Sequence, residues 1–164
     1  MTGSSPHQTL DIGGRTVGPG RPAFVIAEIG SNHNGDMDLA QQLIDSAAAA
    51  GVDAVKFQTF RAADHYSKHT PGFGYLDNTD TYKLIESLEI DRTWHAPLKA
   101  YCDDAGVIFL SSPCDAEAIA EFTDLEMAAF KIASFDLPDT QLIRQAARSG
   151  RPVILSPGMA DWAD

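Results

Sequence analysis

The chain has 164 residues, 44% of them hydrophobic and 21% charged, a composition that suits one globular unit with a sizeable core. Its 23 acidic and 12 basic residues give a formal net charge of −11, which argues against nucleic acid or an anionic membrane as a partner. No apolar run approaches the roughly 18 residues of a membrane helix, and the N-terminus lacks the basic and apolar regions of a secretory signal, so we expect a cytoplasmic protein.

The first expected element is a hairpin within an N-terminal extension, residues 1–20. There the stretch "LDIGGRTVG" places apolar residues on both sides of a Gly-Gly pair, a pattern typical of a tight turn between two strands. We expect residues 21–164 to form the main structural unit.

Five apolar runs after residue 20 are typical of buried strands. Segments with an apolar period near 3.6 residues lie between them and predict helices. Such alternation favours repeated strand–helix units and a parallel sheet. The runs are "AFVIAEIG" (23–30), "AVKFQTF" (54–60), "VIFLSSP" (107–113), "AAFKIAS" (128–134) and "PVILSPGM" (152–159).

The predicted helices have recognisable ends. Glycine follows three helical segments shortly before a strand, where a helix C-cap glycine belongs. Aspartates precede the helices as candidate N-caps. The glycines are Gly51, Gly106 and Gly150, and the aspartates are Asp36 or Asp38, Asp115 and Asp139.

Two architectures fit this alternation, a doubly wound sheet and a barrel. No Gly-rich dinucleotide fingerprint follows the first strand. Lys56 and Gln58 alternate along one face of their strand, and Lys131 also lies within an apolar run. A lysine inside a buried strand is costly unless it is paired, whereas in a barrel it can face the axis near the catalytic mouth. We therefore expect an α/β fold of the (β/α)₈ TIM-barrel type, with the first five strand–helix units present.

Polar residues gather where each predicted strand ends. Taken alone, each has a structural explanation: Lys56 as half of a buried ion pair, His33 as a residue that holds its turn. Taken together, they predict one polar rim at the carboxyl ends of the strands. They are Glu28, Asn32, His33, Lys56, Gln58, Ser111, Ser112, Lys131, Ser134, Asp136, Ser156 and Gly158.

A long polar and aromatic segment, residues 61–81, follows the second predicted strand. A loop of this length in a compact domain is often functional, so one interpretation is a lid or a sugar-binding loop. A mobile surface loop is the alternative, and the sequence leaves both open.

The motifs "IAEIGSNHNGD", "VKFQTF", "FLSSPCD", "FKIASFD" and "ILSPGM" occur in this order between Phe24 and Met159. This ordered set resembles the sialic acid synthase family, in the N-terminal portion of its barrel. That family makes nonulosonic acids such as N-acetylneuraminate, legionaminate and pseudaminate. The resemblance is less specific for the individual sugar.

The resemblance implies a (β/α)₈ barrel that condenses phosphoenolpyruvate with an N-acetylated aminosugar, N-acetylmannosamine or a relative, and releases phosphate. It also implies a divalent metal, manganese or magnesium, whose ligands lie outside this chain. The family's C-terminal antifreeze-like domain is absent here, and its enzymes are homodimers. Because three barrel strands are missing, we expect a fragment or truncated product that carries half of a site.

The resemblance assigns catalytic roles to four residues. Lys56 and Lys131 match the lysines that bind phosphoenolpyruvate, whose anionic groups they would offset. Glu28 matches a carboxylate that binds the sugar hydroxyls and assists proton transfer. Asp136 occupies a position with an acid/base or sugar-orienting role.

Substrate contacts complete the implied site. Four residues fall where the family contacts phosphoenolpyruvate, namely Ser112, Ser134, Ser156 and Gly158. Gln58 and Asn32 are weaker candidates that hold the site in shape.

Three positions depart from the family pattern. Asp136 stands where glutamate is usual, and the shorter side chain shifts its carboxylate by about 1 Å, enough to cost roughly 10²-fold in rate. Pro157 stands where threonine is usual and offers no N–H to a phosphate. Cys114 stands where phenylalanine is common, and we interpret it as a packing residue. Its spacing from Cys102 matches neither a zinc knuckle nor a redox pair.

Two other classes of function remain open from the sequence. A Schiff-base aldolase also uses a barrel lysine, which here would be Lys56 or Lys131. An inactive half-barrel scaffold that associates with another chain is the second alternative.

Overall fold

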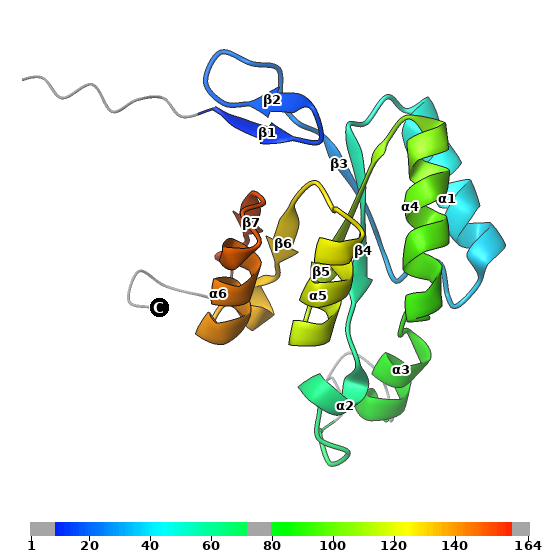
Figure 1. The fold of residues 1–164 in the computed structure, drawn as a ribbon. Helices are drawn as coiled ribbons and strands as arrows, with labels where there is room; N and C mark the ends of the chain where they lie inside the picture. Colours follow the sequence, from blue (N-terminus) through cyan, green and yellow to red (C-terminus); the bar gives the residue numbers. More distant parts are fainter. Residues whose placement is uncertain (1–8, 72–79, 159–164) are drawn as a thin grey trace, which may run out of the picture.

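The structure is a computed structural model that describes residues 9–71 and 80–158. Strands and helices alternate along most of the chain (Figure 1). The strands are β1 (Leu10–Ile12), β2 (Arg15–Val17), β3 (Ile26–Gly30), β4 (Ala54–Thr59), β5 (Ile108–Pro113), β6 (Phe130–Ile132) and β7 (Val153–Leu155). The helices are α1 (Met37–Ala49), α2 (Ala62–His65), α3 (Thr81–Ser87), α4 (His95–Ala105), α5 (Ala116–Asp124) and α6 (Thr140–Arg148), with 3₁₀ turns η1 (Arg92–Trp94) and η2 (Ser134–Asp136).

The five strands that follow the N-terminal hairpin, β3 to β7, are parallel and lie side by side in the order of the chain. β3, β4 and β5 form one hydrogen-bonded sheet, and β6 and β7 form a second. β6 lies beside β5 although no ladder joins them in the described part of the chain (Figure 1). A doubly wound sheet would reverse its strand order at a switch point, and this order does not reverse. The expected α/β fold with parallel strands is confirmed.

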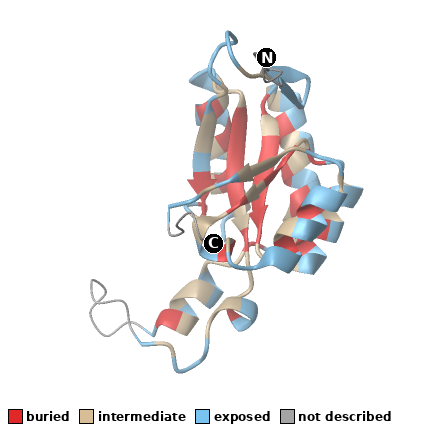
Figure 2. Cartoon of the chain, turned by 90° about the vertical axis from the view of Figure 1, so that its left-hand side faces the viewer, coloured by how far each residue is buried: buried red, intermediate tan, exposed pale blue. Residues whose placement is uncertain are grey.

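The core lies between these strands and the helices. α1 and α4 pack on each other and against β3 and β5, while α5 contacts β5 and α6. Figure 2 shows the central strands as mostly buried, and each long helix as buried along one face. β4 is buried at five of its six positions, which explains why its sequence is nearly continuous in apolar residues.

Most predicted helix ends are confirmed. Asp36, Asp115 and Asp139 each accept backbone N–H groups at the start of a helix. The C-cap glycines all take a left-handed φ between +74° and +78°, a conformation that a Cβ disfavours. The sequence thus marks α1, α4, α5 and α6 by local signals alone.

The strands are shorter than their apolar runs. β3 begins at Ile26, three residues after the run begins, and Val25 before it is 49% exposed. The Val25 N–H is bonded to the Asp53 carboxylate instead of to a neighbouring strand. Hydrophobicity therefore marks the position of each strand, whereas available pairing sets its ends.

Residues 61–81 are not one long loop. The short helix α2 follows β4 directly, and its first N–H donates to Glu89 Oε1 over 2.6 Å. α3 begins at Thr81, and residues 72–79 lie outside the described residues. The first part of this segment is therefore a helical turn fixed by a glutamate, which neither loop interpretation had included.

The N-terminal strands β1 and β2 pair antiparallel around Gly13 and Gly14. Gly13 has a φ of +59°, and a Cβ there would lie 2.8 Å from Ile108 Cδ1. The turn therefore packs against the start of β5, at the amino end of the sheet. None of the helices in the described residues has the length and apolar character needed to cross a membrane.

Candidate active site

Lys56 lies at the centre of the predicted rim. Its side chain is 6% exposed and forms an ion pair with Glu28 of β3, the residue paired with it across the ladder. Lys56 Nζ also donates to Ser112 Oγ of β5 over 3.4 Å. A buried ammonium needs such partners, so the ion-pair interpretation of Lys56 is confirmed and its partner is another predicted site residue.

A backbone irregularity positions Glu28. The β3–β4 register shifts between Glu28 and Gly30, and Gly30 has a φ of +56°. A Cβ at Gly30 would lie 3.6 Å from Glu28 Oε1 and 3.9 Å from the Gln58 amide. The Glu28 side chain remains 52% exposed, so its carboxylate both pairs with Lys56 and faces solvent.

Lys131 of β6 shares the electrostatic environment of this pair. Burial lowers the pKa of Lys131, and the charge of Lys56 lowers it further. The carboxylates of Glu28 and Asp136 act in the opposite direction. Two ammonium groups that sense each other's charge form a place where an anion is favoured.

A cavity of about 220 Å³ lies beside these charges. One part of its lining is polar and includes Gln58, Ser112 and Asp136, and another part is apolar. The apolar lining comes from Phe60, Ile85, Leu88, Ala133 and Phe135. Neither lysine lines this space, which has room for a small ligand, but Ser112, which accepts a hydrogen bond from Lys56, does.

Asp136 has a partner that sequence reasoning missed. Its buried carboxylate accepts a hydrogen bond from His65 Nε2 over 3.0 Å. This bond is the largest cause of the raised pKa of His65. His65 lies in the segment interpreted as a loop, and its contact spans 71 positions, so no local pattern could reveal it. Cys114, interpreted as packing, lines the same cavity.

The remaining phosphoenolpyruvate candidates gather at the ends of β6 and β7. A Cβ at Gly158 would lie 3.8 Å from Ser134 Oγ. The Ser156 N–H donates to the Ile132 carbonyl over 3.2 Å and so extends the pairing of the two strands. Ser134, Ser156 and Gly158 therefore lie close to one another at the end of β6, the strand that carries Lys131.

Some rim candidates act elsewhere. Asn32 Nδ2 donates to the Ile29 carbonyl within its own turn, at 2.9 Å. His33 is fully buried against the rings of Phe57 and Trp94, and its Nδ1 accepts the Gly35 N–H, which confirms that it holds the turn.

Ser111 also lies away from the rim. Its hydroxyl is bonded to Thr59 Oγ1 at 2.9 Å, on the side of β5 that faces the helices. Adjacent strand residues point to opposite faces, and Ser112 takes the rim position instead.

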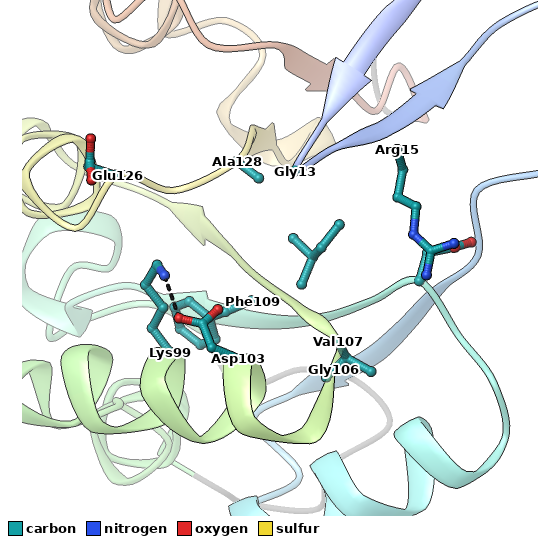
Figure 3. A pocket seen from close by; sticks show the side chains of 11 residues that line it. Gly13, Arg15, Lys99, Asp103, Gly106, Val107, Phe109, Glu126 and Ala128 are labelled. Carbon is teal, nitrogen blue, oxygen red and sulfur yellow. Dashed lines mark hydrogen bonds and ion pairs between the residues drawn. The ribbon is translucent and has the colours of Figure 1, made fainter.

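A second hollow, of about 340 Å³, lies at the amino ends of the strands (Figure 3). It is lined in part by Gly13 and Arg15 of the hairpin and by Lys99 and Asp103 of α4, which are bonded to each other over 2.7 Å. None of the predicted site residues lines it. Ligand sites of parallel α/β folds lie at the carboxyl ends of strands, so we assign the candidate active site to the smaller cavity.

Known proteins share this fold and sequence. The crystal structure of N-acetylneuraminic acid synthetase from Leptospira borgpetersenii serovar Hardjo-bovis matches with a TM-score of 0.84 and 32% identity, over 96% of this chain and 52% of that chain. The spore coat polysaccharide biosynthesis protein SpsE of Bacillus subtilis is 41% identical over 157 residues, 94% of this chain and 42% of its own. N,N'-diacetyllegionaminic acid synthase of Campylobacter jejuni is 33% identical over 149 residues, 88% and 45% respectively.

The chain spans about half of the length of these relatives, or less. The model of the family described as the NeuB family matches residues 43–164, which is most of the chain. The sequence motifs that suggested a sialic acid synthase and the parallel strand order lead to the same group of proteins. The chain belongs to the NeuB family.

Proposed function

We propose that this chain carries the phosphoenolpyruvate-binding part of a synthase that condenses phosphoenolpyruvate with an N-acetylated aminosugar, such as N-acetylmannosamine. The products are a nonulosonic acid and phosphate. The observation that carries the proposal is a pair of lysines from two strands: Lys56, which is buried and donates to Ser112, and Lys131, which is partly buried and whose pKa the charge of Lys56 lowers. Relatives named as synthases of neuraminic, legionaminic and pseudaminic acids support it.

The two lysines would neutralise the phosphate and carboxylate of phosphoenolpyruvate. Ser112, Ser134 and Ser156 would add hydrogen bonds to its oxygens, with Gly158 leaving space for the backbone to approach. Such preorganised cations stabilise the negative charge that develops as phosphate departs. In the proposed reaction carbon 3 attacks the open-chain aldehyde, water attacks carbon 2, and the C–O bond to phosphate breaks.

The carboxylates of Glu28 and Asp136 would bind and orient the sugar substrate. Glu28 is half exposed and can accept hydrogen bonds from sugar hydroxyls once an anion takes over its hold on Lys56. Asp136 would orient the sugar or move a proton near the new hydroxyl, in the position that His65 fixes. Gln58 lines the cavity between them, and Asn32 shapes the turn beside Glu28.

Further features of the synthase belong to the same proposal. The sequential strand order fits one wall of a (β/α)₈ barrel, with residues 1–20 as an extension and 21–164 as part of the barrel. We propose a homodimeric, cytoplasmic enzyme in its longer form. An acidic net charge of −11 fits a protein without nucleic-acid or membrane partners.

The ligand cluster of the described residues does not fit the divalent metal of the resemblance, manganese or magnesium. Within residues 9–71 and 80–158, three metal-ligating side chains come together at one place, His65, Cys114 and Asp136. Magnesium and manganese favour carboxylate, carbonyl and water oxygens, which a thiol and an imidazole do not supply. The proposed roles of these residues therefore require no metal bound by them.

The test is phosphate release from phosphoenolpyruvate with N-acetylmannosamine, in this chain and in a form extended to the length of its relatives. We expect Lys56→Ala to abolish the release and Lys99→Ala, a lysine of α4 bonded to Asp103 away from the cavity, to leave it intact. Activity that survives Lys56→Ala, or that is absent with every acylated aminosugar, would overturn the proposal.

A Schiff-base aldolase is the second candidate, because the lowered pKa of Lys131 makes its amine more available as a nucleophile. The phosphoenolpyruvate route forms no imine. Borohydride treatment with a keto acid would therefore label Lys131 only in an aldolase. An inactive scaffold would show neither label nor phosphate release.

A further inference from the structure

Three side chains capable of binding a metal meet in the wall of the 220 Å³ cavity. His65 comes from α2, Cys114 follows β5, and Asp136 lies in η2. One ligand atom from each lies within 4.8 Å of the other two. Asp136 is buried and the other two are partly buried. Three separate elements of the fold therefore bring an imidazole, a thiol and a carboxylate close together.

The ligand types are those of a zinc site. Imidazole nitrogen, thiolate sulfur and carboxylate oxygen bind Zn²⁺ at about 2.0–2.3 Å, which places tetrahedral ligand atoms about 3.3–3.6 Å apart. His65 Nε2 and Asp136 Oδ1 already lie 3.0 Å apart. The three ligand atoms, all within 4.8 Å of one another, are therefore within about 1.5 Å of the separations that such a site requires.

Two of the three ligands can carry a negative charge. A Cys114 thiolate and the Asp136 carboxylate together neutralise two positive charges. The ion must displace the thiol proton: burial and the charge of Asp136 raise the pKa of the Cys114 thiol, whereas the charge of Lys131 lowers it. Formation of a metal–sulfur bond offsets this cost, because a coordinating thiol is deprotonated by its metal.

We propose that His65, Cys114 and Asp136 form a zinc-binding site whose fourth coordination position opens into the cavity. Three protein ligands and one open position is the arrangement of zinc sites that bind small molecules. The site goes beyond the proposed synthase function, and zinc bound there would occupy Asp136, the carboxylate that the proposed synthase uses for the sugar. Its ligands all lie within this chain, unlike those of the metal that the family resemblance implies.

The test uses Co²⁺ as a spectroscopic probe of the reduced protein, without any substrate. We expect saturable binding of one ion per chain, with a thiolate-to-cobalt charge-transfer band that excess Zn²⁺ removes. Cys114→Ser should abolish the band. His65→Gln should weaken binding by more than about tenfold, since loss of even an outer-shell partner costs about 10–100-fold.

Cys102→Ala is the matched control, because Cys102 is the other free thiol and lies buried in the apolar face of α4. This variant should keep the band. Circular dichroism of each variant separates a lost ligand from a lost fold. The proposal is wrong if a folded Cys114→Ser variant keeps the charge-transfer band, or if the unaltered protein binds no cobalt. Phosphate release is read separately, so either proposal can fail alone.

Discussion

At the scale of single residues, the ion pair between Lys56 and Glu28 decides how the candidate site is held. Lys56 is nearly inaccessible, whereas Glu28 is half exposed and can be hydrated without its partner. The pair therefore differs from a fully buried one, in which removal of one charge strands the other. Under the proposed function, we expect its role to be holding a cation in place for a ligand more than stabilising the fold.

Lys56→Met tests this distinction. We expect the free energy of unfolding to change by no more than about 1 kcal/mol, because methionine fills the volume and Glu28 turns to water. Phosphoenolpyruvate binding should weaken by about 10²-fold or more, as a buried charge-assisted contact is lost. Urea unfolding and calorimetric titration measure the two quantities. Equal losses in both would show that the lysine is mainly structural.

A second residue-level feature is a buried chain of hydrogen bonds behind the rim. Ser111 is bonded to Thr59, Thr59 to His95 Nε2 at 3.0 Å, and His95 Nδ1 donates to Glu121 over 3.2 Å. Burial lowers the pKa of His95, although Glu121 acts against this. Arg92 lowers it further and Asp91 raises it. His95 is therefore held neutral between a hydroxyl and a carboxylate.

Stability should consequently depend on pH. His95 gains its proton at about pH 6.5 in the unfolded chain and at lower pH when folded, so the unfolded state binds more protons in that window. The contribution is complete above pH 6.5 and is lost as the pH falls toward the folded pKa. Urea unfolding from pH 7.5 to 5 should show a smaller decline for His95→Gln than for the unaltered protein. Comparison of the two is needed because burial also lowers the pKa of His33.

At the scale of elements, Asp115 and Asp139 are N-caps with different surroundings. Asp139 accepts two helical N–H groups at 3.0 Å. Asp115 accepts the Ala118 N–H at 2.8 Å and is also ion-paired with Arg92 from η1. Arg92 is only 13% exposed and contacts Glu121 as well. Asp115 thus fixes α5 to the start of α4, whereas Asp139 caps α6 alone.

Asp139→Ala should lower the free energy of unfolding by about 1 kcal/mol, the usual cost of a lost N-cap. Asp115→Ala should cost more, by about 1–3 kcal/mol beyond that, since the mostly buried Arg92 loses one of its acidic partners. Asp115→Asn keeps the cap and removes the charge, so its loss should fall between the two alanine variants. Equal costs for both alanine variants in urea unfolding would show that the Arg92 pair contributes nothing.

The elements also show what the sequence could predict. Caps and apolar periodicity depend on neighbours within a few residues, and the corresponding helices and strands lie close to where the sequence placed them. The sequence did not predict α2, because a helix of four residues is too short to show an apolar periodicity. Its first N–H is also bonded to Glu89, 27 positions away. The Arg92 ion pairs and the His65–Asp136 bond likewise join residues distant in the chain.

At the scale of the whole molecule, the strand order explains why the lysine pattern was informative. Lys56 and Lys131 are charged residues in strands that are otherwise mostly buried. Because a buried charge needs polar partners, the two lysines indicated a shared polar region near the strand ends. Asn32, His33 and Ser111 met the same sequence criterion, yet each is used in a turn or behind the sheet. Residue type and strand-end position identify candidates, but only the direction of each side chain selects among them.

The break between the two parallel sheets has a mechanical consequence. Glu28, Lys56 and Ser112 belong to β3–β5, whereas Lys131, Ser134 and Ser156 belong to the region of β6 and β7, with no ladder between them in the described residues. An anion held by both lysines would act as a crosslink across this seam. Bound phosphoenolpyruvate should therefore slow amide hydrogen exchange in β6 and β7 more than in β4. The substrate would then join the two parallel sheets where, within the described residues, no backbone ladder does so.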